Sequence, residues 1–453
     1  MGSVGLSFGT PTSGQGFDVA STVAQIVGNL QGAETPYKTQ LAALQAQDTA
    51  ISSLGGLLST LYSDLQGLTD PAGVLASKQG SSSDTNSLAL TTATSQAVAG
   101  SHSITVGKLA QNATAYSAAI PAADALAGSI TLQIGAQPAT SIAVDSQNAT
   151  LGGLAAAINQ AGAGVTASVI SDASGARLSL VSNTSGSAGA ITIDSTQLQD
   201  ASSGSPLSFN PGQQAQDAQL IVDGIPLSSS TNTVSNVIPG VTFQLLNTTS
   251  SPVQVQIAND TGSATTSIAT FVKDYNAVIA ALNAQEGKDS SGNAEPLFGN
   301  SLVSSIQQQL SSALTSQQGA GIRTIADLGL QVNGNGTLTV NNDTLTQALT
   351  SQFTEVQNFF QAKSSFGVSM MTAVNSSGSS DPLGTLNQAA QSNARMEGSL
   401  NASVSTLEAS IATQKTQLTA QLNAANQTLQ LIPLQVNEIN QIYSAITGYN
   451  AKA

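Results

Sequence analysis

The chain has 453 residues and a formal net charge of −14, with 40% hydrophobic residues and only 8% charged ones. Eleven Lys and Arg residues are too few for a basic patch that neutralises phosphates, which disfavours nucleic acid and anionic membranes as partners. The chain contains no Cys, which excludes disulfides and thiolate metal sites.

Ser, Thr, Asn, Gln and Gly fill the polar positions instead of charged residues. This composition favours folded, uncharged surfaces of the kind found in extracellular structural proteins, and the length corresponds to roughly two to four domains. The N-terminus, MGSVGLSFGTPTSGQGFD, lacks a basic region and an apolar core, so we expect no cleaved signal peptide. No run of about 18 apolar residues exists, so we expect no membrane insertion.

Apolar residues recur every three or four positions from about residue 20 to residue 70, which predicts a long helix. The stripe consists of Val23, Ile26, Leu30, Ala33, Tyr37, Leu44, Ile51, Leu54, Leu58, Leu61, Leu65 and Leu68. Pro36 is expected to break or kink this helix, and Asp70-Pro71 to end it. We predict that residues 1–35 form a mobile terminal segment.

The pattern changes to β-type between about residues 77 and 260. The stretches SITLQIGA and SPVQVQIAND alternate apolar and polar residues, and Asp223-Gly224 is a strong hairpin signal. One short helix, LGGLAAAINQAG, lies among the predicted strands. We predict one β-rich domain from residues 77–116 and 205–261, and a second, inserted β-rich domain from residues 117–204.

Helical patterns return after the β-rich region and end in a second long helix. Residues 36–76 and 262–434 are predicted to form a helical domain with a small β-hairpin in LGLQVNGNGTLTVNND. Pro433 is expected to kink the last helix, and residues 435–453 to be mobile. Its apolar stripe consists of Leu400, Val404, Leu407, Ile411, Leu418, Leu422, Ala425, Leu429, Ile432, Val436, Ile439, Tyr443 and Ile446.

The two long stripes each exceed 40 residues and carry few charges, so each could be covered by the other. The simplest arrangement is an α+β multidomain fold in which the terminal helices pair as an antiparallel coiled-coil-like stalk, with the β-rich domains inserted between them. The alternative is that each stripe belongs to an ordinary core helix. We predict that oligomer or filament contacts involve Ile26, Leu30, Leu44, Ile51, Leu58, Leu65, Leu407, Ile411, Leu418, Leu422, Leu429 and Ile439.

Catalytic and cofactor motifs were sought as rival interpretations. The GLSFG stretch around Ser7 matches the G-x-S-x-G pattern, but no strand precedes it and the only histidine is His102. We expect His102 to be exposed at the start of a strand. No HExxH, P-loop or EF-hand pattern occurs, so we predict no enzyme activity, no cofactor and no metal site.

Several of these segments resemble the flagellar hook-associated protein 2 family, the filament cap. The N-terminal match is VASTVAQIVGNLQGAETPYKTQLAALQAQDTAISSLGGLLSTL, followed by GSHSITVGKLAQNATAYSA. The C-terminal match includes AQDAQLIVDGIPLSSSTNTVSNVIPGVTFQLLN and GIRTIADLGLQVNGNGTLTVNNDTLTQAL. The segment around Ile158-Asn159 resembles the IN motif that flagellins and hook-associated proteins share. Together these segments cover roughly 300 residues.

The resemblance implies a structural protein that forms a homo-oligomeric ring at the distal tip of the bacterial flagellar filament. Its helical legs would contact the filament end, and flagellin subunits would be inserted beneath its β-rich plate. Further implied partners are the hook-filament junction proteins, an export chaperone and the flagellar type III export apparatus, through which the protein would reach the outside of the cell. Two alternatives stay open: another axial protein of the hook-filament junction, and a tip adhesin that binds host glycans.

Overall fold

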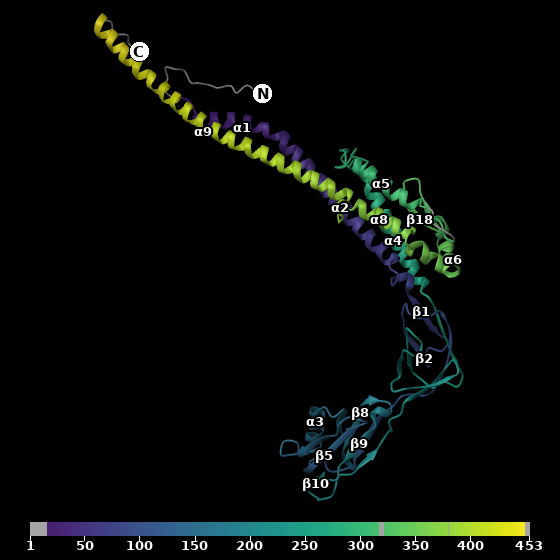
Figure 1. The fold of residues 1–453 in the computed structure, drawn as a ribbon. Helices are drawn as coiled ribbons and strands as arrows, with labels where there is room; N and C mark the ends of the chain where they lie inside the picture. Colours follow the sequence, from purple (N-terminus) through teal and green to yellow (C-terminus); the bar gives the residue numbers. More distant parts are fainter. Residues whose placement is uncertain (1–15, 317–320, 379, 449–453) are drawn as a thin grey trace. The chain divides into compact units, whose positions relative to one another are not determined.

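The computed structural model describes residues 16–316, 321–378 and 380–448. It divides into two compact units (Figure 1). The helical unit lies within residues 1–69 and 267–453, and the β-rich unit is residues 70–266. The predicted α+β class is therefore confirmed.

The helical unit contains most of the helices and one small β-hairpin. Its helices are α1 (Val19–Gln31), α2 (Thr35–Thr69), α4 (Thr261–Gln285, which begins in the other unit), α5 (Ser301–Leu314), α6 (Asn342–Ser351), α7 (Phe353–Gln361), α8 (Phe366–Ser377) and α9 (Thr385–Thr447). Short 3-10 turns lie at Gly32–Glu34 and Ile325–Leu328. The hairpin is β17 (Leu330–Val332) with β18 (Leu338–Val340).

The first helices lie alongside α9 and run in the opposite direction (Figure 1). The amide of Phe17 donates to Asn426 Oδ1 at 2.9 Å. Further along α2, Asn393 Nδ2 donates to Asp48 Oδ1 at 2.7 Å. Residue numbers rise on one helix and fall on the other, so the two contacts define an antiparallel register.

Pro36 affects the first long helix differently from what the sequence predicted. The helical interruption falls at Gly32–Glu34, before Pro36, which lies in the first turn of α2. This prediction was wrong in position because proline is tolerated in a first turn, where its missing amide hydrogen would have no partner. Helix α9 is 63 residues long and includes Pro433; the kink expected there stays a prediction.

An aromatic cluster fills the core of the helical unit. Phe366 at the start of α8 stacks on Phe359 with ring centroids 4.8 Å apart, and it meets Phe360 and Phe271 edge-on at 5.9 and 6.2 Å. All four rings are buried. Helix α2 packs on α8 beside this cluster, so the core anchors the N-terminal helix to the rest of the unit.

The β-rich unit consists of sixteen strands and one α-helix besides the start of α4. The strands are β1 (Lys78–Ser82), β2 (Leu88–Ala93), β3 (Gly100–Lys108), β4 (Asn112–Ser117), β5 (Leu126–Ile134), β6 (Thr140–Val144), β7 (Val165–Asp172), β8 (Gly175–Ser185), β9 (Ile191–Asp194), β10 (Gln199–Asp200), β11 (Phe209–Pro211), β12 (Ala218–Val222), β13 (Ile225–Ser229), β14 (Thr233–Ser235), β15 (Val241–Leu245) and β16 (Val253–Asn259). The helix is α3 (Leu151–Ala161), and 3-10 turns lie at Val74–Ala76 and Ser187–Gly189.

These strands form antiparallel sheets around two separate hydrophobic cores. The five-stranded sheet β1-β16-β3-β12-β13 and the three-stranded sheet β14-β15-β2 enclose one core. The sheets β11-β4-β8-β7 and β10-β5-β6, with β9 paired to β5 and with helix α3, enclose the other. Alternating burial along β12 and β16 matches the alternating sequence pattern, because successive side chains of a strand point to opposite faces.

Two local predictions in this unit are confirmed. Asp223 and Gly224 both have positive φ angles, 52° and 83°, and connect β12 to β13 as a two-residue hairpin turn. LGGLAAAINQAG forms α3, on which Ile158 is fully buried. The amide of Asn159 bonds both the backbone N–H and the C=O of Ala167, each at 2.8 Å, and so ties α3 to β7.

Candidate contact surface of the terminal helices

The twelve residues predicted as contacts lie in different environments. On the N-terminal side, Ile26 and Leu30 of α1 are half-buried, and α1 packs on α9. On α9, Ile411 is buried and the other predicted residues before the tip are half-buried, namely Leu407, Leu418, Leu422 and Leu429. The first and last helices therefore cover much of each other's apolar stripe.

The N-terminal stripe has a second set of neighbours beyond α9. Leu44, Ile51, Leu58 and Leu65 of α2 are all buried. Asp48 lies opposite Asn393, and the two helices are antiparallel, so the part of α2 that carries Leu58 extends past the start of α9 at Thr385. There α2 packs on α7 and α8 instead. Leu58 and Leu65 therefore belong to the globular core of the helical unit.

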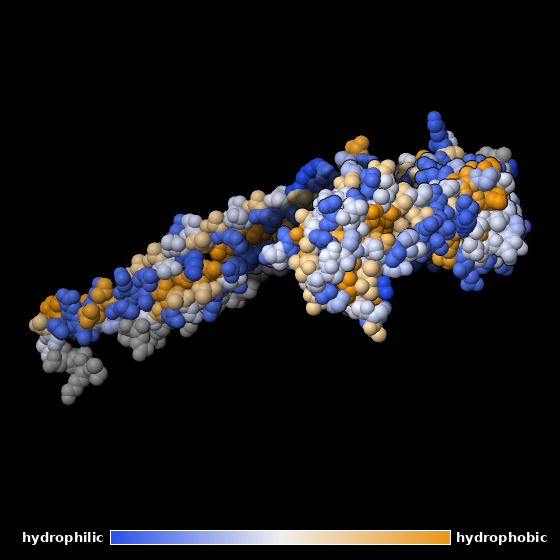
Figure 2. All heavy atoms as spheres, turned by 90° about the horizontal axis from the view of Figure 1, so that it is seen from below, coloured by the Kyte–Doolittle hydropathy of each residue, from blue (hydrophilic) through white to orange (hydrophobic). Residues whose placement is uncertain are grey.

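The last part of α9 leaves its apolar side chains exposed. Ile439 is 63% exposed and Ile446 is 79% exposed, and Leu431, Leu434, Val436, Ile442 and Tyr443 are exposed as well. Figure 2 shows hydrophobic residues at the surface up to the tip of this long helix. We call residues 431–447 the α9 tip. The first described residues, Gly16 and Phe17, lie next to Asn426 and Gln430 of α9, just before this tip.

Polar residues interrupt the otherwise apolar contact between α2 and α9. Asn393 is only 6% exposed and bonds Asp48. Nearer the N-terminus, Lys38 Nζ lies 2.6 Å from the buried carboxylate of Glu34 and 3.8 Å from Glu408 of α9. The hydrogen bond to Glu34 raises the pKa of Lys38, so this lysine stays charged at neutral pH.

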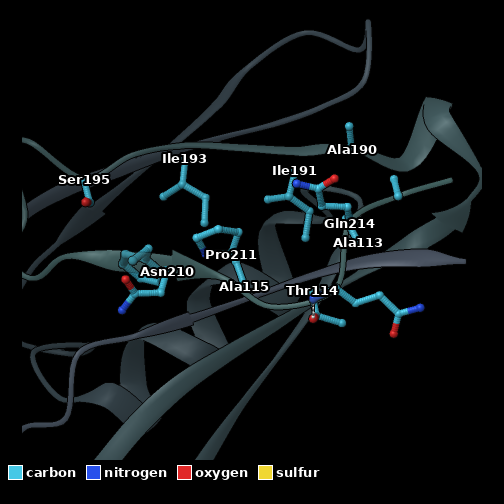
Figure 3. A pocket seen from close by; sticks show the side chains of 13 residues that line it. Ala113, Thr114, Ala115, Ala190, Ile191, Ile193, Ser195, Asn210, Pro211 and Gln214 are labelled. Carbon is cyan, nitrogen blue, oxygen red and sulfur yellow. Dashed lines mark hydrogen bonds between the residues drawn. The ribbon is translucent and has the colours of Figure 1, made fainter.

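The β-rich unit has a cavity of about 470 Å³ next to β4, β9 and β11. Ile191 and Ile193 of β9 face Pro211 across it, and Asn210 and Gln214 contribute amides (Figure 3). No residue that lines the cavity carries a titratable side chain. The lining therefore offers no titratable group for acid–base chemistry.

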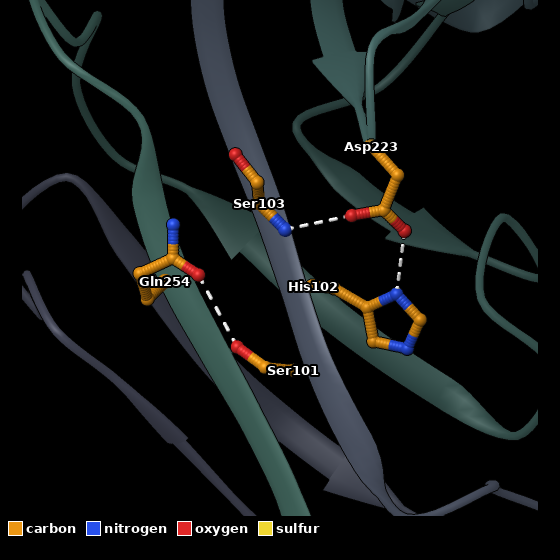
Figure 4. A network of polar contacts seen from close by, with 5 residues as sticks. All are labelled: Ser101, His102, Ser103, Asp223 and Gln254. Atoms are coloured by element: carbon orange, nitrogen blue, oxygen red, sulfur yellow. Dashed lines mark hydrogen bonds and ion pairs between the residues drawn. The ribbon is translucent and has the colours of Figure 1, made fainter.

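His102 lies in β3 and is half-buried, so the prediction of an exposed histidine was wrong. Its Nδ1 lies 2.7 Å from Asp223 Oδ2, and the N–H of Ser103 donates to Asp223 Oδ1 at 2.8 Å (Figure 4). The hydroxyl of Ser101 donates to Gln254 on the neighbouring strand. The described side-chain partner of the imidazole is therefore Asp223, and Ser7 lies outside the described residues.

Asp223→Asn is expected to weaken the β-rich unit slightly, by less than about 1 kcal/mol at pH 7, because the carboxylate is 45% exposed. The bonds from His102 and the Ser103 amide hold the pKa of Asp223 below its usual range. The stabilisation is therefore present above the usual Asp pKa and is lost as pH falls through the lowered value. Thermal melts should separate the two proteins at pH 7 and not near pH 2; an equal difference at both would contradict this.

Three segments of the chain match models of known protein families. Residues 15–113 match the N-terminal profile of flagellar hook-associated protein 2, and residues 215–438 match its C-terminal profile. Residues 129–184 match the flagellin hook IN motif. The chain belongs to the flagellar hook-associated protein 2 family.

Relatives and a solved structure in this family are similar to the chain over most of their length. The B-type flagellar hook-associated protein 2 of Pseudomonas aeruginosa is 28% identical over 391 residues, which is 79% of this chain and 80% of that protein. The Escherichia coli K12 protein is 28% identical over 366 residues, 74% of this chain and 76% of that protein. The crystal structure of the E. coli flagellar cap protein FliD, domains D1-D2-D3, matches with a TM-score of 0.60 at 27% identity, covering 76% of this chain and 99% of that one.

Contacts between residues far apart in the chain could not be predicted from the sequence. Asp48 and Asn393 are 345 positions apart, and no local pattern connects them. Asp64 of α2 and Asp274 of α4 also escaped notice, although their carboxyls interact. The only usable signal was a polar residue within an apolar stripe.

The described part of the chain was also compared with the requirements of a metal site and of a membrane span, and it meets neither. Within residues 16–316, 321–378 and 380–448, no group of three or more His, Asp or Glu side chains could hold a metal ion. Over the same ranges, none of the helices is sufficiently long and apolar to cross a bilayer.

Proposed function

We propose that this chain caps the distal tip of the flagellar filament as a structural subunit and promotes the insertion of flagellin, without catalysing a reaction. The matches to both terminal profiles of the family support this role. The observation that carries the mechanism is the α9 tip, whose apolar residues are exposed on a helix with few charges. Such an exposed apolar surface is typical of a site that binds another protein.

The paired terminal helices act as the stalk of this proposed cap. We propose that α1 and α2 with α9 form an antiparallel, coiled-coil-like element, supported by the contacts Phe17–Asn426 and Asp48–Asn393. Leu407, Ile411, Leu418, Leu422 and Leu429 would hold the stalk together, while Ile439 and its neighbours would contact flagellin at the open filament end.

The remaining predictions about organisation are kept as proposals. Residues 36–76 and 262–434 would be the stalk domain, residues 77–116 with 205–261 one β-rich domain, and residues 117–204 an inserted one. Two hydrophobic cores within the β-rich unit support the last division. Residues 1–35 and 435–453 would be mobile in the free protein and become ordered when they meet a partner.

Partners follow from the cap role. We propose a homo-oligomeric ring in contact with flagellin, at the extracellular end of the filament. Assembly would follow export through the flagellar type III apparatus with a chaperone, and would first place the cap on the hook-filament junction proteins. The 215–438 profile favours this role over that of a junction protein.

A variant of the α9 tip tests the proposed function. Ile439→Gln, Ile442→Gln and Ile446→Gln together remove apolar surface, while Gln preserves helix propensity and adds no charge. We expect cells that carry only this variant to lose swimming motility and to release unpolymerised flagellin into the medium. The melting temperature of the purified protein should stay unchanged, since exposed substitutions usually change stability by less than about 0.5 kcal/mol.

The matched control replaces three exposed hydrophobic residues elsewhere. Val98→Gln, Phe298→Gln and Leu383→Gln lie outside helices and strands, and each of the three residues is more than half exposed. This control should swim normally. Normal filaments in cells with the tip variant would contradict the proposal that the tip contacts flagellin.

A further inference from the structure

We infer that the partly buried Asp48–Asn393 hydrogen bond determines the register between α2 and α9, and thereby the length of the α9 tip. This inference concerns the isolated subunit and does not depend on the cap role. It starts from a property of the α9 stripe, whose apolar residues repeat every seven positions. Because of that repeat, apolar packing along the part of α9 beyond the globular core distinguishes registers seven residues apart only weakly.

The repeat holds for several of the apolar residues along α9. Shifting α9 by seven residues exchanges Leu400 with Leu407 and Ile411 with Leu418, and it exchanges Leu422 with Leu429 in the same way. The exceptions are Gln414, seven positions after Leu407, Lys415, seven positions before Leu422, and Glu397, seven positions before Val404. A shift of seven residues changes the axial position by about 10 Å, which is a large part of the roughly 26 Å spanned by the 17 residues of the tip.

The polar contacts remove this ambiguity. Asp48 bonds Asn393 at 2.7 Å, and Asn393 is buried. A shift of seven residues in either direction would place a leucine opposite Asp48, Leu400 in one direction and Leu386 in the other. The partly buried carboxylate and the buried amide would then both lose their partners, which strongly disfavours the shifted pairing.

The ionic contact discriminates in the same sense. Lys38 lies 3.8 Å from Glu408 and is 54% exposed, so its attraction contributes little by itself. In one shifted register Lys415, seven positions after Glu408, would lie opposite Lys38 and repel it. In the other, the neutral Asn401, seven positions before Glu408, would lie opposite Lys38. Asp48 and Asn393 are therefore the main determinants, and Lys38 adds a smaller preference.

Crosslinking measures the register directly, because the chain has no Cys and only engineered thiols react. Three full-length proteins carry Lys38→Cys with Glu408→Cys, Asn401→Cys or Lys415→Cys. The first reports the observed register and the other two report shifts of seven residues. A short bismaleimide is applied to dilute monomer, and intramolecular crosslinks are quantified by mass spectrometry. All three proteins lack Lys38 and therefore its ionic contact with Glu408, so the experiment tests the Asp48–Asn393 pair alone.

Two changes are then made in each of the three proteins. Asp48→Leu with Asn393→Leu is expected to raise the shifted crosslinks at least about tenfold, because the unpaired polar groups no longer penalise them. The exchange Asp48→Asn with Asn393→Asp restores a hydrogen bond across the same pair, and it should crosslink like the parent. Gln45→Leu with Ser392→Leu adds the same side chains at exposed positions and should also leave the register unchanged.

The outcomes separate a register function from general stabilisation. The Leu pair should melt no lower than the parent, since replacing buried polar groups by apolar ones is often neutral or stabilising. The inference is overturned if the Leu pair still crosslinks only between positions 38 and 408. It is equally overturned if the Asn–Asp exchange shifts register as much as the Leu pair does. If the Leu pair does not fold, the exchange and Asn393→Leu alone decide by the same criterion.

Discussion

Phe366→Ala is expected to lower the free energy of unfolding of the helical unit by about 3–5 kcal/mol, the usual cost of truncating a buried phenylalanine. Phe366 is fully buried and contacts three other phenylalanines, including a stacked contact with Phe359 at 4.8 Å. Alanine would lose these contacts and leave a cavity that the neighbouring helices fill only partly. For a unit of this size the loss corresponds to a fall in melting temperature of roughly 10 °C.

Phe298 offers the matched control for this prediction. It is the same residue type in the same unit but is 54% exposed. Phe298→Ala should leave the melting temperature within about 1 °C of the parent. Differential scanning calorimetry of both variants measures the difference. Equal losses would show that the aromatic cluster is not the core that holds α2 and α8 together.

Asp64→Asn is expected to stabilise the helical unit at neutral pH. Burial, and then the neighbouring carboxyl of Asp274, raise the pKa of Asp64 to about 6, while Lys273 acts in the opposite direction. The folded protein therefore holds this proton more tightly than the unfolded chain does. The stabilisation by the protonated form is complete below the usual Asp pKa and is lost as pH rises through about 6.

The asparagine variant should remove this loss. Its amide carries no charge and can donate to Asp274, so we expect a gain of about 1–2 kcal/mol at pH 7.5, reduced from the full linkage value because Asp64 is partly exposed. The gain should shrink towards zero below about pH 4. Denaturant unfolding at both pH values measures it, with Glu438→Gln on the exposed face of α9 as control. An equal gain at both pH values would exclude charge repulsion as the cause.

Much of the local structure was predictable because it depends on neighbouring residues. A spacing of three and four between apolar residues specifies a buried helix face, and it correctly indicated α1, α2 and α9. Asp223-Gly224 adopts the positive φ angles that a two-residue hairpin requires. Pro36 was misjudged because the same residue that breaks a helix interior is suited to a first turn.

The candidate site was only partly predictable, since a stripe reveals that a face is apolar but not what covers it. Leu58 and Ile439 each belong to one of the two predicted apolar stripes, and the sequence gives no reason to expect that one is buried and the other exposed. In the folded chain Leu58 is buried beside α8, while Ile439 lies exposed on the α9 tip. The difference arises from register, because α9 begins too late to meet Leu58 and extends too far for α1 to cover Ile439.

The sequence by itself determined the helical and β-rich regions, the uncharged surface and the resemblance to the cap family, because each depends on residue type and local spacing. Only the tertiary structure decided which apolar residues are covered and which polar residues meet, as Asp48 meets Asn393 and Asp64 meets Asp274. These pairs join residues hundreds of positions apart. Their contacts depend on how helices pack in space, and local periodicity carries no information about that packing.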